Sequence, residues 1–247
     1  MRNSLFIENS SNIYIKNNTI FDKKGNFTIE PNKKFNLRDN FTITLDIYYY
    51  LFNGFPFLRN ANRLNIFKEQ LLNNLPKVVV HPNDLYIYIR SGDIFVRINT
   101  GSISGYYQPP LCFYENILNK YKFNEVFIIS EDKLNPVIQN LIKYTYIKKT
   151  QNNLKLDISY LINSYNIVEA KSTFFSVIIK FNNKLKFLWK YDFYQQKIYK
   201  FPFYYTLYKM NSSNNYKRKM IPWANLPNQK KLMINEKCIN NFDIIKQ

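Results

Sequence analysis

Cysteine and histidine are nearly absent from this chain. It has two cysteines, Cys112 and Cys238, and a single histidine, His81. No Cys-x-x-Cys pair exists, so we expect neither a zinc site nor a disulfide framework, although one long-range disulfide stays open. Histidine-dependent nucleophilic catalysis would have to use His81, which stands in a predicted loop between a run of valines and Pro82. We therefore expect no catalytic role for this histidine.

Acidic residues are also scarce. Lys and Arg number 35 against 17 Asp and Glu, which gives a formal net charge of +18. Such a charge is typical of proteins that bind nucleic acid or anionic membranes, and it would equally suit an enzyme whose substrate carries a diphosphate. The lysines are spread along the chain, with no basic helix and no zinc-finger spacing. We therefore do not expect nucleic acid as the partner, but a basic, aromatic-rich nucleic-acid-binding protein is kept as the alternative class.

A long uninterrupted hydrophobic run is missing as well. Near the N-terminus the apolar stretch Leu5-Phe6-Ile7 ends at Glu8, which is too short for a signal peptide. The most apolar segment, residues 43–58, contains Asp46 and Asn53, so no membrane span is predicted. We expect a soluble chain as given, and its compartment stays open. With 46% hydrophobic residues over 247 positions, the chain can bury the core of one large or two modest domains.

Strand and helix patterns alternate between residues 85 and 189. Short apolar or alternating runs predict strands at 85–89, 125–129, 146–147, 166–169 and 186–189. Apolar residues at helical spacing predict helices between them, at 111–121, 135–142, 157–164 and 175–181. This order predicts an α/β fold with a doubly wound, Rossmann-type parallel sheet.

We expect three parts of the chain. Residues 1–82 would form a small N-terminal domain with short strands and a helix at 63–75, ending at the Pro82-Asn83-Asp84 interruption. Residues 83–190 would form the Rossmann-like, nucleotide-binding domain. Residues 191–247 are rich in aromatics and lysine and are cut by prolines, so they would form short helices or irregular structure packed back on the body.

The predicted strand at 85–89 ends in a cluster of polar residues. Apolar residues alternate with two tyrosines along it, and Arg90-Ser91-Gly92-Asp93 follows at once. Ligands of α/β sheets bind at the carboxyl ends of strands, and the planar fork of an arginine matches a phosphate. The segment therefore predicts an anionic group held at the strand tip. An ordinary strand end with an Arg–Asp surface pair explains it equally well.

Two other predicted strands also end in polar residues. Ser130-Glu131-Asp132 follows one of them, and Ser172-Thr173 follows the other. Since the carboxyl ends of parallel strands meet at one sheet edge, both segments should lie near Arg90. Ser172-Thr173 would either open a helix whose free N–H groups bind phosphate or simply cap that helix. We interpret Glu131-Asp132 as a capping or solvated pair, and Asp157 as the N-cap of the helix at 157–164.

Taken together, these segments resemble the α-1,2/α-1,6/protein-O-fucosyltransferase superfamily. Residues 88–93, Tyr-Ile-Arg-Ser-Gly-Asp, are similar to its His-x-Arg-x-Gly-Asp motif, and Asp157 with the later Ser172-Thr173-Phe174 is similar to a second motif. Residues 107–114 look like a segment of some members. The resemblance covers about residues 84–190. It implies a GT-B arrangement of two Rossmann-like domains, a nucleotide-sugar donor such as GDP-fucose, a glycan or protein acceptor, and no metal.

The resemblance also implies roles for the matching residues. Arg90 would be the catalytic residue, because it would stabilise the charge that builds on the departing diphosphate, and Asp93 would fix Arg90 and the turn. Asp157 would contact the base or order the nucleotide loop. Tyr107 and Gln108 would lie on the acceptor side, and the reaction would invert the anomeric carbon. The other donor-binding residues would be Tyr88, Gly92, Ser172, Thr173 and Phe174.

Two features depart from the family pattern. Tyr88 stands where the motif has histidine, and a tyrosine cannot carry the charge of an imidazole. The first domain is short for a complete acceptor-binding half. Either feature fits a different sugar nucleotide or a catalytically inactive relative, which is a further alternative. No general base follows from the sequence, although Glu131 and Glu169 are candidates.

Overall fold

The structure is a computed structural model that divides into two compact units, Met1–Leu75 and Pro76–Gln247. In the first unit, three short strands pair antiparallel in sequence order. They are β1 (Tyr14–Lys16), β2 (Thr19–Asp22) and β3 (Gly25–Phe27). The predicted helix at 63–75 lies almost entirely outside the described residues. The structure describes residues 14–16, 19–22, 25–27, 72–96, 106–150, 153–193, 205–238 and 241–245.

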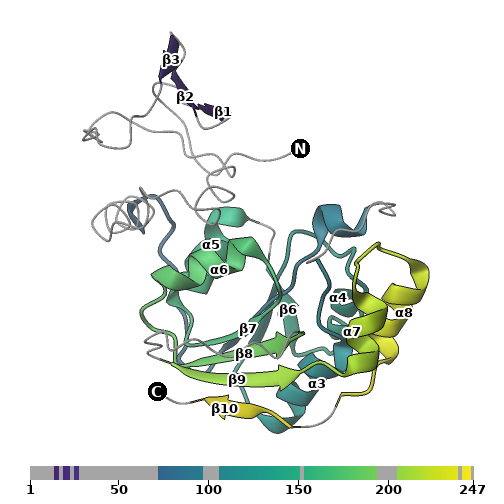
Figure 1. Ribbon diagram of the computed structural model, residues 1–247. Helices are drawn as coiled ribbons and strands as arrows, with labels where there is room; N and C mark the ends of the chain where they lie inside the picture. The colour runs from purple at the N-terminus through teal and green to yellow at the C-terminus, as the bar shows by residue number, and fades with distance from the viewer. Residues whose placement is uncertain are drawn as a thin grey trace. The chain divides into compact units, whose positions relative to one another are not determined.

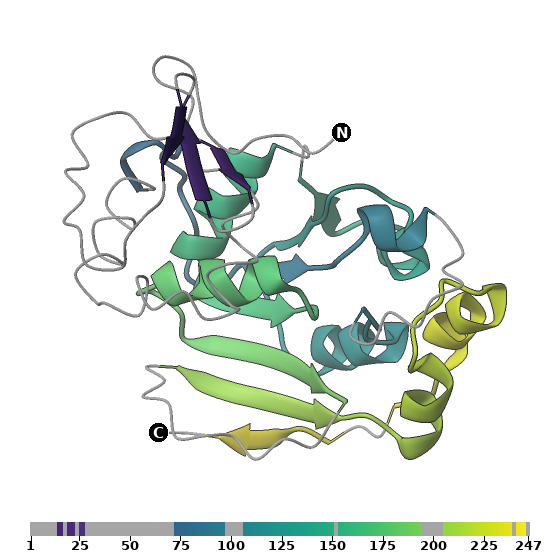
Figure 2. The same ribbon diagram turned by 45° about the horizontal axis from the view of Figure 1, so that its top comes forward.

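A seven-stranded sheet organises the second unit (Figure 1). Six parallel strands are joined by β10 (Asp243–Ile245), which runs antiparallel to β9 at one edge (Figure 2). The order across the sheet is β10-β9-β8-β7-β4-β5-β6, the order of doubly wound nucleotide-binding folds, so the predicted α/β class is confirmed. The parallel strands are β4 (Leu85–Tyr88), β5 (Val126–Ile129), β6 (Ile147–Lys149), β7 (Asn166–Glu169), β8 (Phe187–Asp192) and β9 (Thr206–Asn211).

Helices cover both faces of this sheet (Figure 1). One face carries α3 (Leu111–Lys120), α4 (Pro136–Leu141), α7 (Asn214–Met220) and α8 (Pro227–Asn235). The other face carries α5 (Leu154–Asn163) and α6 (Thr173–Ile178), the latter continued by the 3-10 helix η3 (Ile179–Phe181). Residues 191–247 supply β9 and β10 as well as α7 and α8, where the sequence predicted helices or irregular structure. The lysine inside β9, Lys209, interrupts the apolar pattern that would have indicated a strand.

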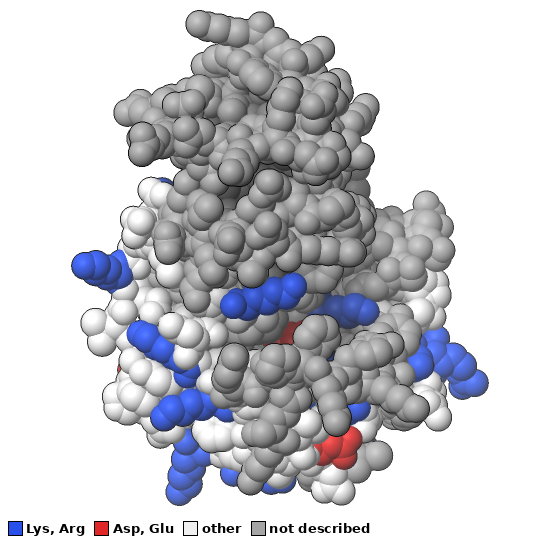
Figure 3. Space-filling view, turned by 60° about the vertical axis from the view of Figure 1, so that its left-hand side comes forward, with Lys and Arg blue, Asp and Glu red and all other residues white. Residues whose placement is uncertain are grey.

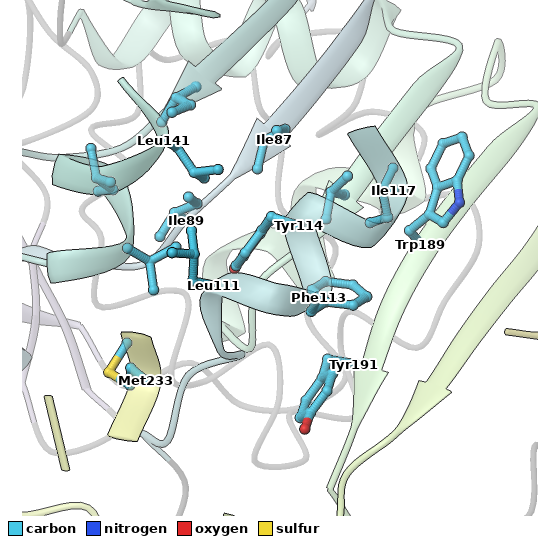
Figure 4. Close-up of a cluster of buried hydrophobic side chains, with 14 of the residues drawn as sticks. Ile87, Ile89, Leu111, Phe113, Tyr114, Ile117, Leu141, Trp189, Tyr191 and Met233 are labelled. Atoms are coloured by element: carbon cyan, nitrogen blue, oxygen red, sulfur yellow. The ribbon is translucent and has the colours of Figure 1, made fainter. Parts of the chain in front are cut away.

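The alternation in β4 sorts its side chains onto the two faces. Leu85, Ile87 and Ile89 are completely buried in the core beneath α3. Figure 4 shows Ile87 and Ile89 facing side chains of α3, with Met233 of α8 nearby. Tyr86 points to the opposite face, where its ring stacks on that of Tyr160 in α5. Each large apolar side chain buried in this way contributes roughly 1.5–3 kcal/mol, so both faces hold the strand tip in place.

The C-terminal helices are fastened to the segments that flank the β4 tip. Trp223, between α7 and α8, donates a hydrogen bond of 3.0 Å from Nε1 to the carbonyl of Ile94 in the 3-10 helix η2 (Gly92–Phe95). Tyr216 of α7 donates from its hydroxyl to the carbonyl of Gln108 over 2.8 Å. Cys112 and Cys238 form the long-range disulfide that the sequence left open, with their Cα atoms 5.6 Å apart.

Candidate functional site

The strand order places a topological switch point between β4 and β7. From β4 the chain builds outward through β5 and β6, returns to β7, and then builds in the other direction through β8 and β9. Ligands of open α/β sheets bind at such a point, beyond the carboxyl ends of the two strands. Arg90 follows β4 and Ser172 follows β7. The Tyr88 hydroxyl donates to Ser172 Oγ over 3.2 Å, so the two motifs predicted to converge do meet here.

Tyr88 is held as a hydrogen-bond donor at this switch point. Its ring stacks on Phe175 of α6 with centroids 5.5 Å apart, and Phe174 lies 5.7 Å from it. Burial raises the pKa of Tyr88 to about 12, although Arg90 and Ser172 act to lower it. The hydroxyl therefore keeps its proton at neutral pH. Thr173 begins α6, but its side chain lies outside the described residues.

Arg90 presents its guanidinium between two carboxylates. Nη2 lies 2.6 Å from Asp93 Oδ1, and Nη1 pairs with Glu131 Oε1. Burial alone would lower the pKa of Arg90, but Glu131, Tyr88 and Asp93 outweigh it and raise that pKa. The arginine is thus always charged. Each terminal nitrogen of the guanidinium binds one carboxylate, and guanidinium donors of this kind also bind phosphate oxygens.

Glu131, a candidate general base in the sequence analysis, makes a contact with Arg90 that the sequence interpretation did not predict. It was interpreted as part of a capping or solvated pair, but it binds the guanidinium of Arg90. Burial raises its pKa, while the guanidinium lowers it. A signal was present in the strand register. Tyr88 of β4 pairs with Ile129 of β5, so the residues two positions beyond each, Arg90 and Glu131, emerge side by side.

Hydrogen bonds between two loops fix the backbone at the β4 tip. Asp132 accepts hydrogen bonds from the Ser91 hydroxyl and, over 3.3 Å, from the Gly92 amide. Asn135 donates from Nδ2 to the carbonyl of Arg90 over 2.9 Å, and its Oδ1 caps α4. The loop after β5 therefore sets the direction in which the arginine leaves its strand.

Gly92 has to be glycine for two reasons. Its φ is +68°, and an added Cβ would overlap Glu131 Oε2. We expect Gly92→Ala to lower the free energy of unfolding by about 1–2 kcal/mol and to push Glu131 away from Arg90. Denaturant unfolding measures the loss. In the Gly92→Ala/Glu131→Ala double variant the overlap is gone, so the cost should be smaller than the sum of the single variants; simple additivity would contradict this account.

A cluster of buried polar groups lies along the carboxyl edge beyond β5 and β6. Asp157 Oδ1, Ser130 Oγ and Thr150 Oγ1 are buried, and none has a hydrogen-bond partner among the described residues. Nearby, Lys149 Nζ donates to the carbonyl of Ser130 over 3.1 Å. Burial raises the pKa of Asp157, while Thr150 and Lys149 lower it. Buried polar groups are normally hydrogen-bonded, so this cluster is suited to receive a polar ligand.

The interpretation of Asp157 as a helix N-cap was wrong. Helix α5 begins at Leu154, and Asn153 caps it by accepting from the amides of Lys155 and Leu156. Asn153 has the same capping chemistry and stands four residues earlier, which the sequence pattern did not resolve. Asp157, 6% exposed, is left inside the helix without a capping role.

Tyr107 and Gln108 lie beside the segment that follows β7. Gln108 Nε2 donates to the carbonyl of Lys171 over 3.4 Å, and the Tyr107 hydroxyl pairs with Lys171 Nζ. The Lys171 ammonium also lies 4.1 Å from the centroid of the Tyr107 ring. Both predicted acceptor-side residues are fully buried, and both contact Lys171, which precedes Ser172.

The basic side chains do not gather at one place on the face drawn in Figure 3. Lys and Arg side chains lie at separate points over the described surface, with few acidic side chains among them.

Within the described ranges, no helix has the length and apolar character needed to cross a membrane.

The geometry defines a class of protein rather than a particular one. It is a doubly wound α/β protein with arginine, tyrosine and serine side chains converging at its switch point. In comparisons with protein-family models, curated proteins and solved structures, nothing matches the chain.

Proposed function

We propose that this protein is an inverting glycosyltransferase of the fucosyltransferase type. It transfers a sugar from a nucleoside diphosphate donor, GDP-fucose by preference, to a hydroxyl of a glycan or protein. The observation that carries the proposal is the Tyr88–Ser172 hydrogen bond at the switch point, together with the action of Arg90 on the same Tyr88 hydroxyl. A guanidinium and two hydroxyls are groups that hold a diphosphate. The first unit would supply the second half of a GT-B arrangement.

The spacing of two polar clusters fits the length of a nucleoside diphosphate. Asp157, Ser130 and Thr150 lie beyond β5 and β6, while Ser172 follows β7 on the other side of β4. Neighbouring strands are about 4.8 Å apart, so the distance from β6 to β7 is on the order of 14 Å. An extended nucleotide would therefore place its base at the first cluster and its phosphates at Arg90 and Ser172.

The buried Oδ1 atom of Asp157 favours guanine as the base, because no described residue donates a hydrogen bond to this atom. Guanine offers two adjacent donors, its N1–H and its 2-amino group, and a carboxylate accepts both. Adenine and uracil lack this pair of donors on one edge. The hydroxyls of Ser130 and Thr150, which either donate or accept, would complete the contacts to the base.

Catalysis would rest on stabilising the leaving group. As the bond between the anomeric carbon and the diphosphate breaks, charge builds on the diphosphate, and Arg90 would bind it more strongly than in the ground state. Tyr88 would support this binding because its raised pKa keeps the hydroxyl protonated as a donor. Asp93, which is 74% exposed, would exchange its place on Arg90 for a phosphate oxygen.

A change of base preference tests this function. The Asp157→Asn variant should lose GDP affinity by at least about tenfold and gain affinity for xanthosine diphosphate. The amide Nδ2 of asparagine donates to the 2-carbonyl of xanthine, where the carboxylate accepted from guanine. Calorimetric titration with the two nucleotides measures both changes. Asp243→Asn, the same substitution at an exposed strand residue, is the control and should change neither. Unaltered GDP affinity in Asp157→Asn would remove Asp157 from the donor site.

A further inference from the structure

Three strands of the sheet carry charged residues where a parallel sheet is normally apolar. β7, β8 and β9 are interior strands, and such strands are usually apolar on both faces. Across them, Glu169, Lys190 and Lys209 stand side by side in register. Two residues toward the amino ends, on the same face of the sheet, the corresponding row is apolar, with Ile167, Leu188 and Leu207. The charges therefore begin only near the carboxyl edge, where ligands bind.

The charged residues of this row form ion pairs, and the pairs differ in their N–O distances and in how exposed their side chains are. Lys209 Nζ lies 3.2 Å from Asp192 Oδ2, and both side chains are nearly buried. Lys190 Nζ lies 3.6 Å from Glu169 Oε1, and Lys190 is 45% exposed while Glu169 is 13% exposed. The Glu169 carboxylate thus has the looser pair, and its partner lysine has room to move. Buried charges in such a position are expected at functional sites.

Lys171 connects the row to the switch point. It stands between Glu169 and Ser172 in sequence, and its ammonium is held by Tyr107. Burial, and after it the nearby Lys190, lowers the pKa of Lys171 to about 8. Glu169 is affected by the same neighbours, since burial raises its pKa while Lys190 and Lys171 lower it. The charged row and the Tyr88–Ser172 site are therefore neighbours at the carboxyl ends of β4, β7 and β8.

We propose that Glu169 is the general base of the transfer and that the row Glu169–Lys190, with Lys171, receives a hydroxylated acceptor. The assignment rests on the proposed function. The acceptor oxygen forms a bond to the anomeric carbon and gives its proton to the Glu169 carboxylate. The bond from that carbon to the diphosphate oxygen breaks, and its electron pair stays on the diphosphate beside Arg90. Glu169 then releases the proton to water.

The other carboxylates near the switch point are less suited to this role. Glu131 is bound to the guanidinium of Arg90 and packs against Gly92. Asp192 is held closely by Lys209. Glu169 is near the switch point without contacting Arg90 in any described hydrogen bond or ion pair. Its row also combines ammonium donors with a carboxylate acceptor, which suits the hydroxyl groups of a carbohydrate or of water.

The test uses the full chain with GDP-fucose as the probe and water as the acceptor. Glu169→Gln should keep the GDP dissociation constant within about twofold of the native value and slow the release of GDP from GDP-fucose by about 100-fold or more. Glu125→Gln is the matched control, because it makes the same substitution at a half-exposed glutamate beside the amino end of β5. It should leave both quantities unchanged. Glu169→Asp should recover part of the rate because it keeps the carboxylate.

Each contrary result has a separate meaning. If Glu169→Gln releases GDP from GDP-fucose at the native rate, the assignment is overturned. It is also overturned if the variant loses GDP binding along with its rate, because Glu169 would then act on donor binding. A native protein that binds GDP but releases none from GDP-fucose also overturns it, because a placed base activates water. A native protein that binds no GDP overturns the proposed function itself, and the base assignment with it.

Discussion

Replacing Arg90 with alanine should reduce GDP affinity by about 100-fold or more, a loss on the order of 3 kcal/mol. The guanidinium is a fixed positive charge that acts on the Tyr88 hydroxyl, and its two terminal nitrogens now bind the carboxylates of Asp93 and Glu131. Without it, the diphosphate would lose both of these charged donors. Calorimetric titration with GDP at moderate salt measures the loss, because salt suppresses nonspecific attraction to a chain of net charge +18.

Two further variants define what Arg90 contributes. Arg218→Ala removes the same charge from an exposed position on α7 and should leave GDP affinity unchanged. Arg90→Lys keeps the positive charge but loses the two planar guanidinium donors. Its GDP affinity should therefore fall between those of the native protein and Arg90→Ala. If Arg90→Ala bound GDP as tightly as the native protein, the strand tip would not be the diphosphate site.

Removing the disulfide should have the largest effect on stability. We expect Cys112→Ser/Cys238→Ser to lower the free energy of unfolding by about 2–5 kcal/mol. The bond joins residues 126 positions apart, so without it the unfolded chain gains much freedom. It also ties the start of α3, which follows the Tyr107-Gln108 segment, to the residues after α8. Denaturant unfolding with and without a thiol reductant measures the change.

The double-serine variant supplies its own control. Reductant should lower the unfolding midpoint of the native protein to nearly that of the variant, and it should leave the variant unchanged. A native midpoint that does not respond to full reduction, verified by thiol titration, would contradict a stabilising role for the bond.

The sequence predicted the sheet because its signals are local. Alternating or continuous apolar runs mark β4, β5, β7 and the start of β8, and the intervening helices show helical spacing. The contact of Tyr88 with Ser172 followed from one general property of parallel sheets, that the carboxyl ends of neighbouring strands lie at the same edge. Shifts of a few residues remain, as in α5, which begins at Leu154 instead of Asp157.

The features that the sequence did not predict depend on contacts between residues far apart in the chain. The Arg90–Glu131 pair is set by the register of β4 against β5, and the Tyr107–Lys171 pair by the fold of a loop onto β7. β9 and β10 were missed because lysine and polar residues interrupt their apolar pattern. Such pairings leave no periodic signal in the sequence. The prediction about the Thr173 side chain falls outside the described residues.

The central claim is that the switch point between β4 and β7 binds a nucleoside diphosphate. Its most direct test is calorimetric titration of the native protein with GDP, run beside a single-stranded oligonucleotide at low and moderate salt. Our account predicts saturable binding of one GDP per chain that persists at moderate salt, and only weak, salt-sensitive binding of the oligonucleotide. Tight, salt-sensitive oligonucleotide binding without any GDP binding would contradict the account and support a nucleic-acid-binding protein instead.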